Sequence, residues 1–318
     1  MRLTLYSFIL WVALTGNIFA QGTSTPAGQP LDLITTTGTL KGTLLLPAST
    51  KPVKVVLLHA GSGPTNRDGN IGSMQNNSLK LLAEALYAQG IATVRYDKRG
   101  IAESLGAGLK EADLRFTSYT DDATAWVEKL KKDKRFSHVI VLGHSEGSTI
   151  GMIAARQGKA DGFISVAGPG QSADKIIKQQ LQPQPKMVQD MAFPILDSLA
   201  KGILVPDANP MLQSLFRPSV QPYLISWFKI DPQVEIKKLT VPVLVVQGTQ
   251  DLQVSTQEAQ MLLDAQPKAK LVIIENMNHV LKETTADKAA NMATYSNPDQ
   301  PVMPKLIQEI VAFVKAVK

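Results

Sequence analysis

The feature that most constrains this sequence is a Gly-X-Ser-X-Gly motif that joins an apolar run to a helical pattern. The residues at 139–142 are all apolar, and the motif begins with the next residue, at 143–147. Apolar residues at helical spacing then begin at Ile150, and Gly158 supplies a stop. A buried strand that turns sharply into a helix is the context of a nucleophile elbow, in which the central serine, here Ser145, projects above the sheet. Because so short a motif also arises by chance, its function depends on residues further along the chain.

A serine hydroxyl is a poor nucleophile at neutral pH and needs a base within hydrogen-bond reach. The chain has four histidines. His138 opens the elbow strand, His144 lies inside the motif and is expected to point away from the serine, and His59 is expected to be structural. His279 follows a strand-like run at 271–275, so it should lie on a loop at the carboxyl edge of the sheet. We therefore predict His279 as the base, with an ordinary surface histidine as the alternative.

A carboxylate is also needed, because it fixes the tautomer of the histidine and stabilises its cation. Asp251 follows the strand-like run at 243–247 in a Gly-Thr-Gln-Asp segment. An aspartate at such a place also commonly forms a turn or caps the next helix. However, Ser145, Asp251 and His279 occur in that chain order, each just past a predicted strand end, which is the order of a known family of hydrolytic sites. We predict these three residues as a catalytic triad.

Strand and helix patterns alternate along most of the chain. Residues 31–46, interrupted at Gly38, predict an antiparallel hairpin. Apolar runs predict buried parallel strands at 53–58, 91–96, 139–143, 163–167, 243–247 and 271–275. Amphipathic patterns predict helices at 78–89 (with Ser78 as the N-cap), 119–132, 256–264 and 303–317. This alternation predicts the α/β class, with a mostly parallel, doubly wound sheet flanked by helices.

Residues 171–238 differ from the rest of the chain. Prolines are frequent there, helical fragments lie between them, and no β-branched strand-like run occurs. We predict a helical cap inserted into the domain rather than a second domain with its own sheet. Met187, Met191 and Met211 either line an acyl pocket, because methionine adapts to varied partners, or pack the core of the cap itself. The sequence favours neither alternative.

With these motifs in place, the chain resembles the α/β-hydrolase superfamily over nearly all of residues 31–318. Residues 61–69, 95–100 and 143–148 are also similar to a bacterial group of serine carboxylesterases, which in turn is similar to the serine aminopeptidases of the S33 type. The resemblance implies an α/β-hydrolase fold with a helical cap, and hydrolysis of a small-molecule acyl ester through an acyl-enzyme intermediate.

The resemblance also implies an oxyanion hole, in which backbone N–H groups hold the negative charge of the tetrahedral intermediate. The loop at 59–70 is rich in glycine and follows a predicted core strand, although long turns often have this composition. We expect the Ser62 and Glu146 N–H groups to be the two donors. An aminopeptidase or thioesterase on the same site is the first alternative, and a non-catalytic binding protein with the same fold is the second.

The charged residues near these motifs are expected to form ion pairs or to affect substrate binding through their charge, and not to take part in the reaction. Arg95, Asp97 and Arg99 are expected to form a buried ion-pair cluster that braces the loops. Glu146 is expected to repel acidic substrates or to pair with Arg67 or Arg95. The net charge is +6, but the 33 basic residues are scattered and no nucleic-acid motif occurs, so no nucleic-acid partner is predicted. The histidines and carboxylates lack ligand spacing, so neither a metal nor an organic cofactor is predicted.

The first twenty residues indicate where the protein is located relative to the cell. Arg2 precedes an apolar run at 3–14, and a small residue, Ala20, ends the segment. This pattern predicts a signal peptide at 1–20, export to the periplasm or the extracellular space, and no membrane span after cleavage. An uncleaved anchor is the alternative, since residues 3–20 approach the minimum span. Residues 21–30 are expected to be a flexible lead-in. The pattern makes no prediction of an oligomeric state.

Overall fold

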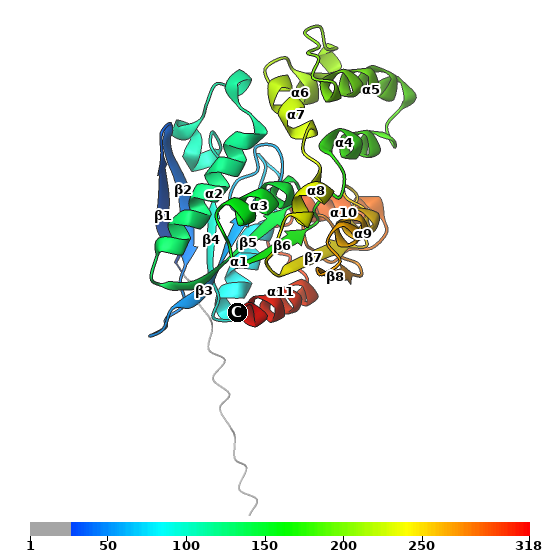
Figure 1. Ribbon diagram of the computed structural model, residues 1–318. Coiled ribbons are helices and arrows are strands. Elements are labelled where there is room, and N and C mark those ends of the chain that lie inside the picture. The colour runs from blue at the N-terminus through cyan, green and yellow to red at the C-terminus, as the bar shows by residue number, and fades with distance from the viewer. Residues whose placement is uncertain (1–26) are drawn as a thin grey trace, which may run out of the picture.

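The computed structural model describes residues 27–318. The predicted signal peptide and most of the lead-in lie outside the described residues. One eight-stranded sheet forms the centre of the fold, with the strand order β1-β2-β4-β3-β5-β6-β7-β8 (Figure 1). The strands are β1 Gln29–Thr35, β2 Gly38–Leu45, β3 Val53–His59, β4 Ala92–Tyr96, β5 Phe136–His144, β6 Gly162–Val166, β7 Val243–Gly248 and β8 Lys270–Ile274. β1 and β2 pair antiparallel, as do β2 and β4, and all other pairs are parallel.

Helices cover both faces of the sheet because its central strands are apolar on both sides. On β3, Val55 and Leu57 face one core, and Val56 and Leu58 face the other. The first core lies under α2 Phe116–Lys132, α3 Glu146–Gln157, α8 Pro232–Lys237 and α9 Thr256–Ala265. The second lies under α1 Ser78–Ala88 and α11 Pro304–Ala316. A two-sided sheet of this kind explains why the strands read as continuous apolar runs rather than alternating ones.

The predicted fold class is confirmed, including the hairpin and all six parallel strands, with differences at the ends of elements. β5 begins at Phe136 and α2 at Phe116, each three residues before the predicted start. The prediction of Ser78 as a helix cap was wrong, because Asn77 occupies the cap in a left-handed conformation with φ 53°. The sequence also gave no signal for α10 Lys288–Ala293, a helix of only six residues.

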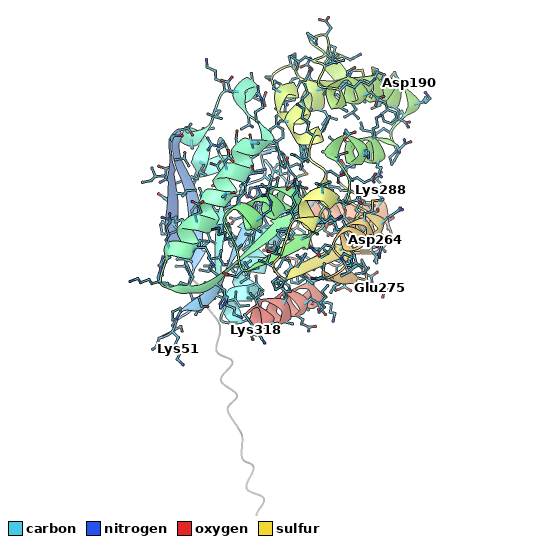
Figure 2. All side chains as sticks on the ribbon, in the orientation of Figure 1. Lys51, Asp190, Asp264, Glu275, Lys288 and Lys318 are labelled. Carbon is cyan, nitrogen blue, oxygen red and sulfur yellow. The ribbon has the colours of Figure 1, made fainter. Side chains whose placement is uncertain are left out.

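Between β6 and β7 the described chain forms helices and turns only. The helices are α4 Ala173–Leu181, α5 Lys186–Ala200, α6 Gln213–Phe216, α7 Gln221–Phe228 and α8. Figure 1 shows α4 to α7 grouped beyond one end of the sheet, and we call these four helices the cap. Figure 2 places Asp190 of the cap at the opposite end of the molecule from Lys51 and Lys318.

A third apolar core attaches the cap to the domain below it. Tyr223 and Trp227 of α7 contact Phe116 at the start of α2, and the Phe116 and Trp227 rings stack with centroids 6.1 Å apart. The Tyr223 and Tyr119 rings meet edge to face at 5.7 Å. Such aromatic pairs stabilise a contact beyond their buried area, so α7 is the helix that fixes the cap over the sheet.

No helix within residues 27–318 combines the length and the apolar character that a bilayer crossing requires.

Candidate active site

Ser145 lies in the sharp turn between β5 and α3, in a strained backbone conformation with φ 57° and ψ −127°. The motif glycines make this turn possible. A Cβ on Gly143 would lie 2.0 Å from the carbonyl oxygen of Gly147, and a Cβ on Gly147 would lie 2.6 Å from that of His59. Only glycine fits either position, because backbone would clash with any side chain. Strain of this kind is typical of functional sites, and here it presents one hydroxyl at the N-terminus of α3.

Asp251 and His279 are joined by a hydrogen bond. The His279 Nδ1–H donates to Asp251 Oδ2 at 2.8 Å, and the side chains are 0% (Asp251) and 6% (His279) exposed. The other carboxylate oxygen accepts the backbone N–H groups of Gln253 and Val254 at 2.8 and 2.9 Å. Gln247 Nε2 also donates to Oδ2, at 2.9 Å. Side-chain donors from His279 and Gln247 and two backbone N–H groups thus fix the carboxylate. Because Nδ1 carries the proton of a neutral His279, its Nε2 is unprotonated.

The electrostatics favour an ionised Asp251. Burial works to raise the pKa of its carboxyl, but the positive charge and hydrogen bond of His279, together with the backbone N–H groups of Val254 and Gln253, outweigh burial. The net effect is a pKa below the ordinary aspartate value. A charged carboxylate facing Nδ1–H is the arrangement that stabilises an imidazolium when Nε2 gains a proton.

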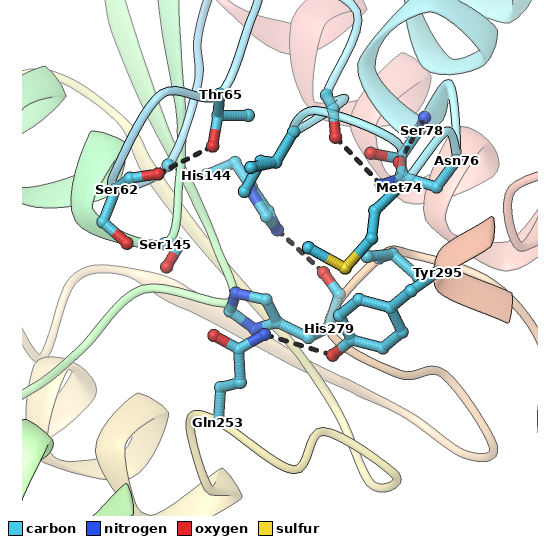
Figure 3. A pocket seen from close by; sticks show the side chains of 14 residues that line it. Ser62, Thr65, Met74, Asn76, Ser78, His144, Ser145, Gln253, His279 and Tyr295 are labelled. Atoms are coloured by element: carbon cyan, nitrogen blue, oxygen red, sulfur yellow. Dashed lines mark hydrogen bonds between the residues drawn. The ribbon is translucent and has the colours of Figure 1, made fainter. Parts of the chain in front are cut away.

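Ser145 and His279 line the same pocket, so the structure brings together the predicted nucleophile and the predicted base (Figure 3). Within the part of the chain that the structure describes, no hydrogen bond joins the Ser145 hydroxyl to the His279 ring. Such catalytic hydrogen bonds are often long in ligand-free enzymes and shorten when substrate binds.

Of the two predicted oxyanion donors, Ser62 borders this pocket, and Glu146 follows Ser145 directly in the chain. Gly61 lies so close to the nucleophile that a Cβ added to it would be 3.1 Å from the Cβ of Ser145. Ser62 lines the pocket, and its carbonyl accepts the Thr65 hydroxyl at 2.7 Å (Figure 3). For residues 27–318, no protein acceptor engages the backbone N–H of Ser62 or of Glu146. Neither N–H group is therefore occupied by another group of the described protein.

The sequence is similar to those of known proteins. Residues 74–223 match the family model described as serine aminopeptidase, S33. The chain is 28% identical over 255 residues to esterase EstD of Thermotoga maritima, which is 76% of this chain and 58% of EstD. The chain thus spans less than two thirds of the length of that curated relative.

Solved structures share the fold. Est1E from Butyrivibrio proteoclasticus is 18% identical, with a TM-score of 0.58 over 91% of this chain and 100% of that chain. The α/β hydrolase GrgF from Penicillium sp. sh18 is 17% identical, with a TM-score of 0.62 over 92% of this chain and 99% of that chain. The chain has the α/β-hydrolase fold that these structures share. The predicted resemblance is confirmed for the fold, and the catalytic roles of individual residues remain predictions.

His144 makes a contact in this fold that the sequence did not indicate. We expected it to point away from the serine, but it lines the same pocket, and its Nε2–H donates to the backbone carbonyl of His279 at 2.8 Å. The two imidazole rings are 4.9 Å apart. His144 therefore tethers the loop that carries the predicted base. No sequence signal indicates this contact, because it joins residues 135 positions apart.

The interior histidines make stability depend on pH. Burial, and then the nearby Lys98 charge, lower the pKa of His59 to about 3, and burial, and then the His279 charge, lower that of His144 to about 4. Below the ordinary pKa of about 6.5 the unfolded chain binds these protons while the folded chain does not. We expect the unfolding free energy to fall from pH 6.5 toward pH 4, each histidine contributing up to about 1.4 kcal/mol per pH unit.

Urea unfolding at pH 6.5, 5.5 and 5.0 checks this expectation. The variant His59→Gln should flatten the slope by one histidine. An unaltered slope in His59→Gln would show that its burial does not drive the pH dependence.

Two expectations about the charged residues were wrong. Arg95, Asp97 and Arg99 do not form one cluster, because each side chain pairs outside the group. The pairs are Arg95 with Asp68, Asp97 with Arg67, and Arg99 with Asp122. The pairs separate because Arg67 and Asp68 of the long loop reach across to β4 and the residues after it.

Glu146 pairs with neither Arg67 nor Arg95. It accepts a hydrogen bond from the Tyr223 hydroxyl of the cap and is only 3% exposed. Burial raises the pKa of its carboxyl, against the lowering effects of Lys98 and Tyr223. The carboxylate is therefore directed away from the ligand pocket, toward the cap helix α7.

The pocket itself is small and mixed in character, with a cavity volume of about 80 Å³. Its apolar wall consists of Ile71, Met74, Val280 and Tyr295. Gln253 donates a hydrogen bond to the Tyr295 hydroxyl at 3.1 Å beside His279 (Figure 3). Most of the wall thus comes from the loop after β3 and from the segment after β8.

The cap methionines do not line this pocket. Met187 and Met211 are 59% and 64% exposed, and Met191 packs against the third core. Of the two alternatives, lining an acyl pocket does not apply to this cavity, which lies among the loops at the edge of the sheet, and packing within the cap applies to Met191.

Among residues 27–318, no group of three or more acidic or histidine side chains is arranged to hold a metal ion.

Proposed function

We propose that this α/β-hydrolase is a serine hydrolase that cleaves carboxylic esters, with Ser145 as nucleophile, His279 as base and Asp251 as its orienting carboxylate. One observation carries the proposal: His279, hydrogen-bonded to Asp251, lines the same pocket as Ser145, which lies in a strained turn. The similarity to esterase EstD supports the choice of reaction.

The mechanism follows from the groups present. His279 Nε2 takes the hydroxyl proton as Ser145 Oγ attacks the ester carbonyl, and Asp251 stabilises the imidazolium. The Ser62 and Glu146 N–H groups hold the oxyanion. His279 then gives its proton to the departing alcohol, which leaves an acyl-serine. Water attacks this intermediate by the same route, with His279 as base, and releases the carboxylic acid.

The pocket lining favours an ester over an N-terminal amino acid. An aminopeptidase needs a carboxylate to bind the substrate amine, but none of the residues that line this pocket is acidic. Glu146 could have served, but it is buried and engaged by Tyr223. A buried carboxylate with a partner of its own is a poor anchor for a charged amine.

A matched substrate panel tests the reaction class. One butyryl group is presented as its p-nitrophenyl ester, its p-nitroanilide and a thiocholine thioester, beside alanine p-nitroanilide. We expect the largest kcat/KM for the ester. A larger value for alanine p-nitroanilide would establish the aminopeptidase alternative, and a larger value for the thioester would establish a thioesterase. Inertness toward all four would favour the non-catalytic binding protein.

The cavity volume predicts a preference for short acyl chains. About 80 Å³ accommodates roughly five to eight water-sized groups, which is a few carbons. We expect kcat/KM for p-nitrophenyl acetate to butyrate to exceed that for the octanoate at least about tenfold, because forcing extra methylenes into a filled cavity costs about 1–3 kcal/mol, and about 1.4 kcal/mol is tenfold.

A variant of Met74, with a variant of Met187 as its control, tests this prediction further. The variant Met74→Ala, which widens the apolar wall, should shift the optimum to longer chains, and Met187→Ala, on the exposed cap, should not. An octanoate preference in the wild type would contradict the short-chain prediction.

We also propose that the protein is exported, on the strength of the charged, apolar and small-residue pattern at 1–20. Expression of the full chain in a bacterium, followed by fractionation and N-terminal sequencing, tests this. The expected mature protein begins at Gln21 and lies outside the cytoplasm. Retention of Met1 in a membrane fraction would favour the uncleaved anchor.

A further inference from the structure

Lys98 is a fully buried lysine that contacts the oxyanion loop. It follows β4, is 1% exposed, and its ammonium donates to the backbone carbonyls of Gly61 and of Gly63, the latter at 2.9 Å. The ammonium also lies 5.3 Å from the centre of the Tyr119 ring. Burial of a lysine is costly unless its donors are satisfied, so these carbonyls are the partners that hold it in place.

Peptide geometry connects this contact to the predicted oxyanion donor. In a trans peptide the C=O of one residue and the N–H of the next point in opposite directions, and all peptide bonds of the described chain are trans. The Gly61 carbonyl points toward Lys98, so the Ser62 N–H points away from it. Gly61 packs against Ser145, and Gly61 and Ser62 both line the pocket, which leaves the pocket side for the Ser62 N–H.

A second buried charge completes the arrangement. Glu146 supplies the other predicted donor through its N–H, and its side-chain charge works to raise the pKa of Lys98 against the larger lowering effect of burial. Tyr223 of the cap holds the Glu146 carboxylate. The charge of Glu146 thus acts on Lys98, and Glu146 connects this region to helix α7 through Tyr223.

We propose that Lys98 is a positioning residue for the oxyanion hole: by binding the Gly61 and Gly63 carbonyls, it turns the intervening peptide so that the Ser62 N–H faces the reacting carbonyl. The inference rests on the proposed serine hydrolase function. It assigns Lys98 no contact with substrate, and its effect should therefore appear in the stabilisation of charge rather than in substrate binding.

The variants Lys98→Met and Lys98→Gln test the proposal. Methionine keeps the length and removes the donors, whereas glutamine keeps an N–H₂ group that can reach one carbonyl. We expect Lys98→Met to lower kcat about 10²–10³-fold with little change in KM, as for loss of one oxyanion donor, and Lys98→Gln to recover part of this loss. Affinity for a trifluoromethyl ketone, which forms a tetrahedral oxyanion on the serine, should fall by a similar factor.

Lys54→Met is the matched control. Lys54 lies at the start of the neighbouring strand β3, and its ammonium also donates to backbone carbonyls, among them Val314 and Lys315 at 3.0 and 2.9 Å. These carbonyls lie at the end of α11, in the region of Lys318, far from the cap (Figure 2). We expect Lys54→Met to lower thermal stability and to leave kcat and ketone affinity within about twofold.

The outcomes separate the two proposals. Unchanged kcat and ketone affinity in both folded Lys98 variants would overturn the positioning role while leaving the serine hydrolase intact. A loss of kcat that merely tracks loss of folded protein by circular dichroism, with ketone affinity per folded molecule unchanged, would also overturn it. If instead the wild-type protein neither hydrolyses esters nor binds the ketone, the proposed function itself fails.

Discussion

Replacement of Ser145 by alanine is expected to lower kcat about 10⁵–10⁶-fold, an effect that only loss of the base His279 should equal. The variant keeps Asp251, His279 and both predicted oxyanion donors but has no atom that can form the acyl intermediate. In another serine hydrolase, loss of the nucleophile lowers kcat by about 2 × 10⁶, which leaves only binding and oxyanion stabilisation. Hydrolysis of p-nitrophenyl butyrate under saturating substrate measures the effect.

Ser148→Ala is the control for this variant. Ser148 lies one helical turn further along, is fully buried, and its hydroxyl is 2.7 Å from that of Ser165. We expect this variant to retain kcat within about tenfold and to lose some stability, because the Ser165 hydroxyl loses its partner. Hydrolysis that survives in Ser145→Ala would mean that the chemistry occurs elsewhere.

Asp251→Asn is expected to lower kcat about 10⁴-fold. All the contacts of this carboxylate are with donors: His279 Nδ1, Gln247 Nε2 and the backbone N–H groups of Gln253 and Val254. Two of these donors contact Oδ2 (those of His279 and Gln247) and two contact Oδ1, so an asparagine must turn its NH₂ group toward one of the two sets. If it faces His279, the ring adopts the wrong tautomer and Nε2 can no longer accept the serine proton.

The measurements are kcat for p-nitrophenyl butyrate and the tautomer of His279 by ¹⁵N NMR. Glu258→Gln is the matched control, because Glu258 is also buried and also accepts a backbone N–H, that of Gly170, but lies outside the pocket. We expect that control to change kcat less than tenfold. Equal activities of Asp251→Asn and Glu258→Gln would refute the orienting role.

The sheet could be predicted from sequence because its signal is local and strong. Strand β3 reads as an unbroken apolar run because both of its faces are covered, and strand ends followed by glycine or polar loops mark the carboxyl edge. Element ends were predicted less well. Phe116 at the start of α2 belongs to the core shared with the cap, and that contact depends on residues more than 100 positions later.

The proximity of Asp251 and His279 could also be predicted, since both follow neighbouring parallel strands, β7 and β8. The catalytic roles of these two residues and of Ser145 stay predictions until they are measured. What could not be predicted were contacts set by loop and cap conformation. The His144 bond to the His279 carbonyl, the Lys98 contacts with the oxyanion loop and the Tyr223 bond to Glu146 all join distant segments.

Pocket composition was the least predictable feature. The sequence left open whether the methionines of the insertion line a pocket or pack the cap, whereas the described wall includes Met74 from the loop after β3 and Tyr295 from beyond β8. Hydrophobic composition alone does not distinguish a cap that lines a site from one that buries its own apolar residues against α2 and α3.

The most direct test of the central claim is to label the purified wild-type protein with a fluorophosphonate, which reacts with activated serines, and to identify the modified residue by peptide mass spectrometry. The account predicts stoichiometric modification of Ser145, with loss of ester hydrolysis in proportion to labelling. Modification of a different residue, or full esterase activity with Ser145 unlabelled, would contradict it.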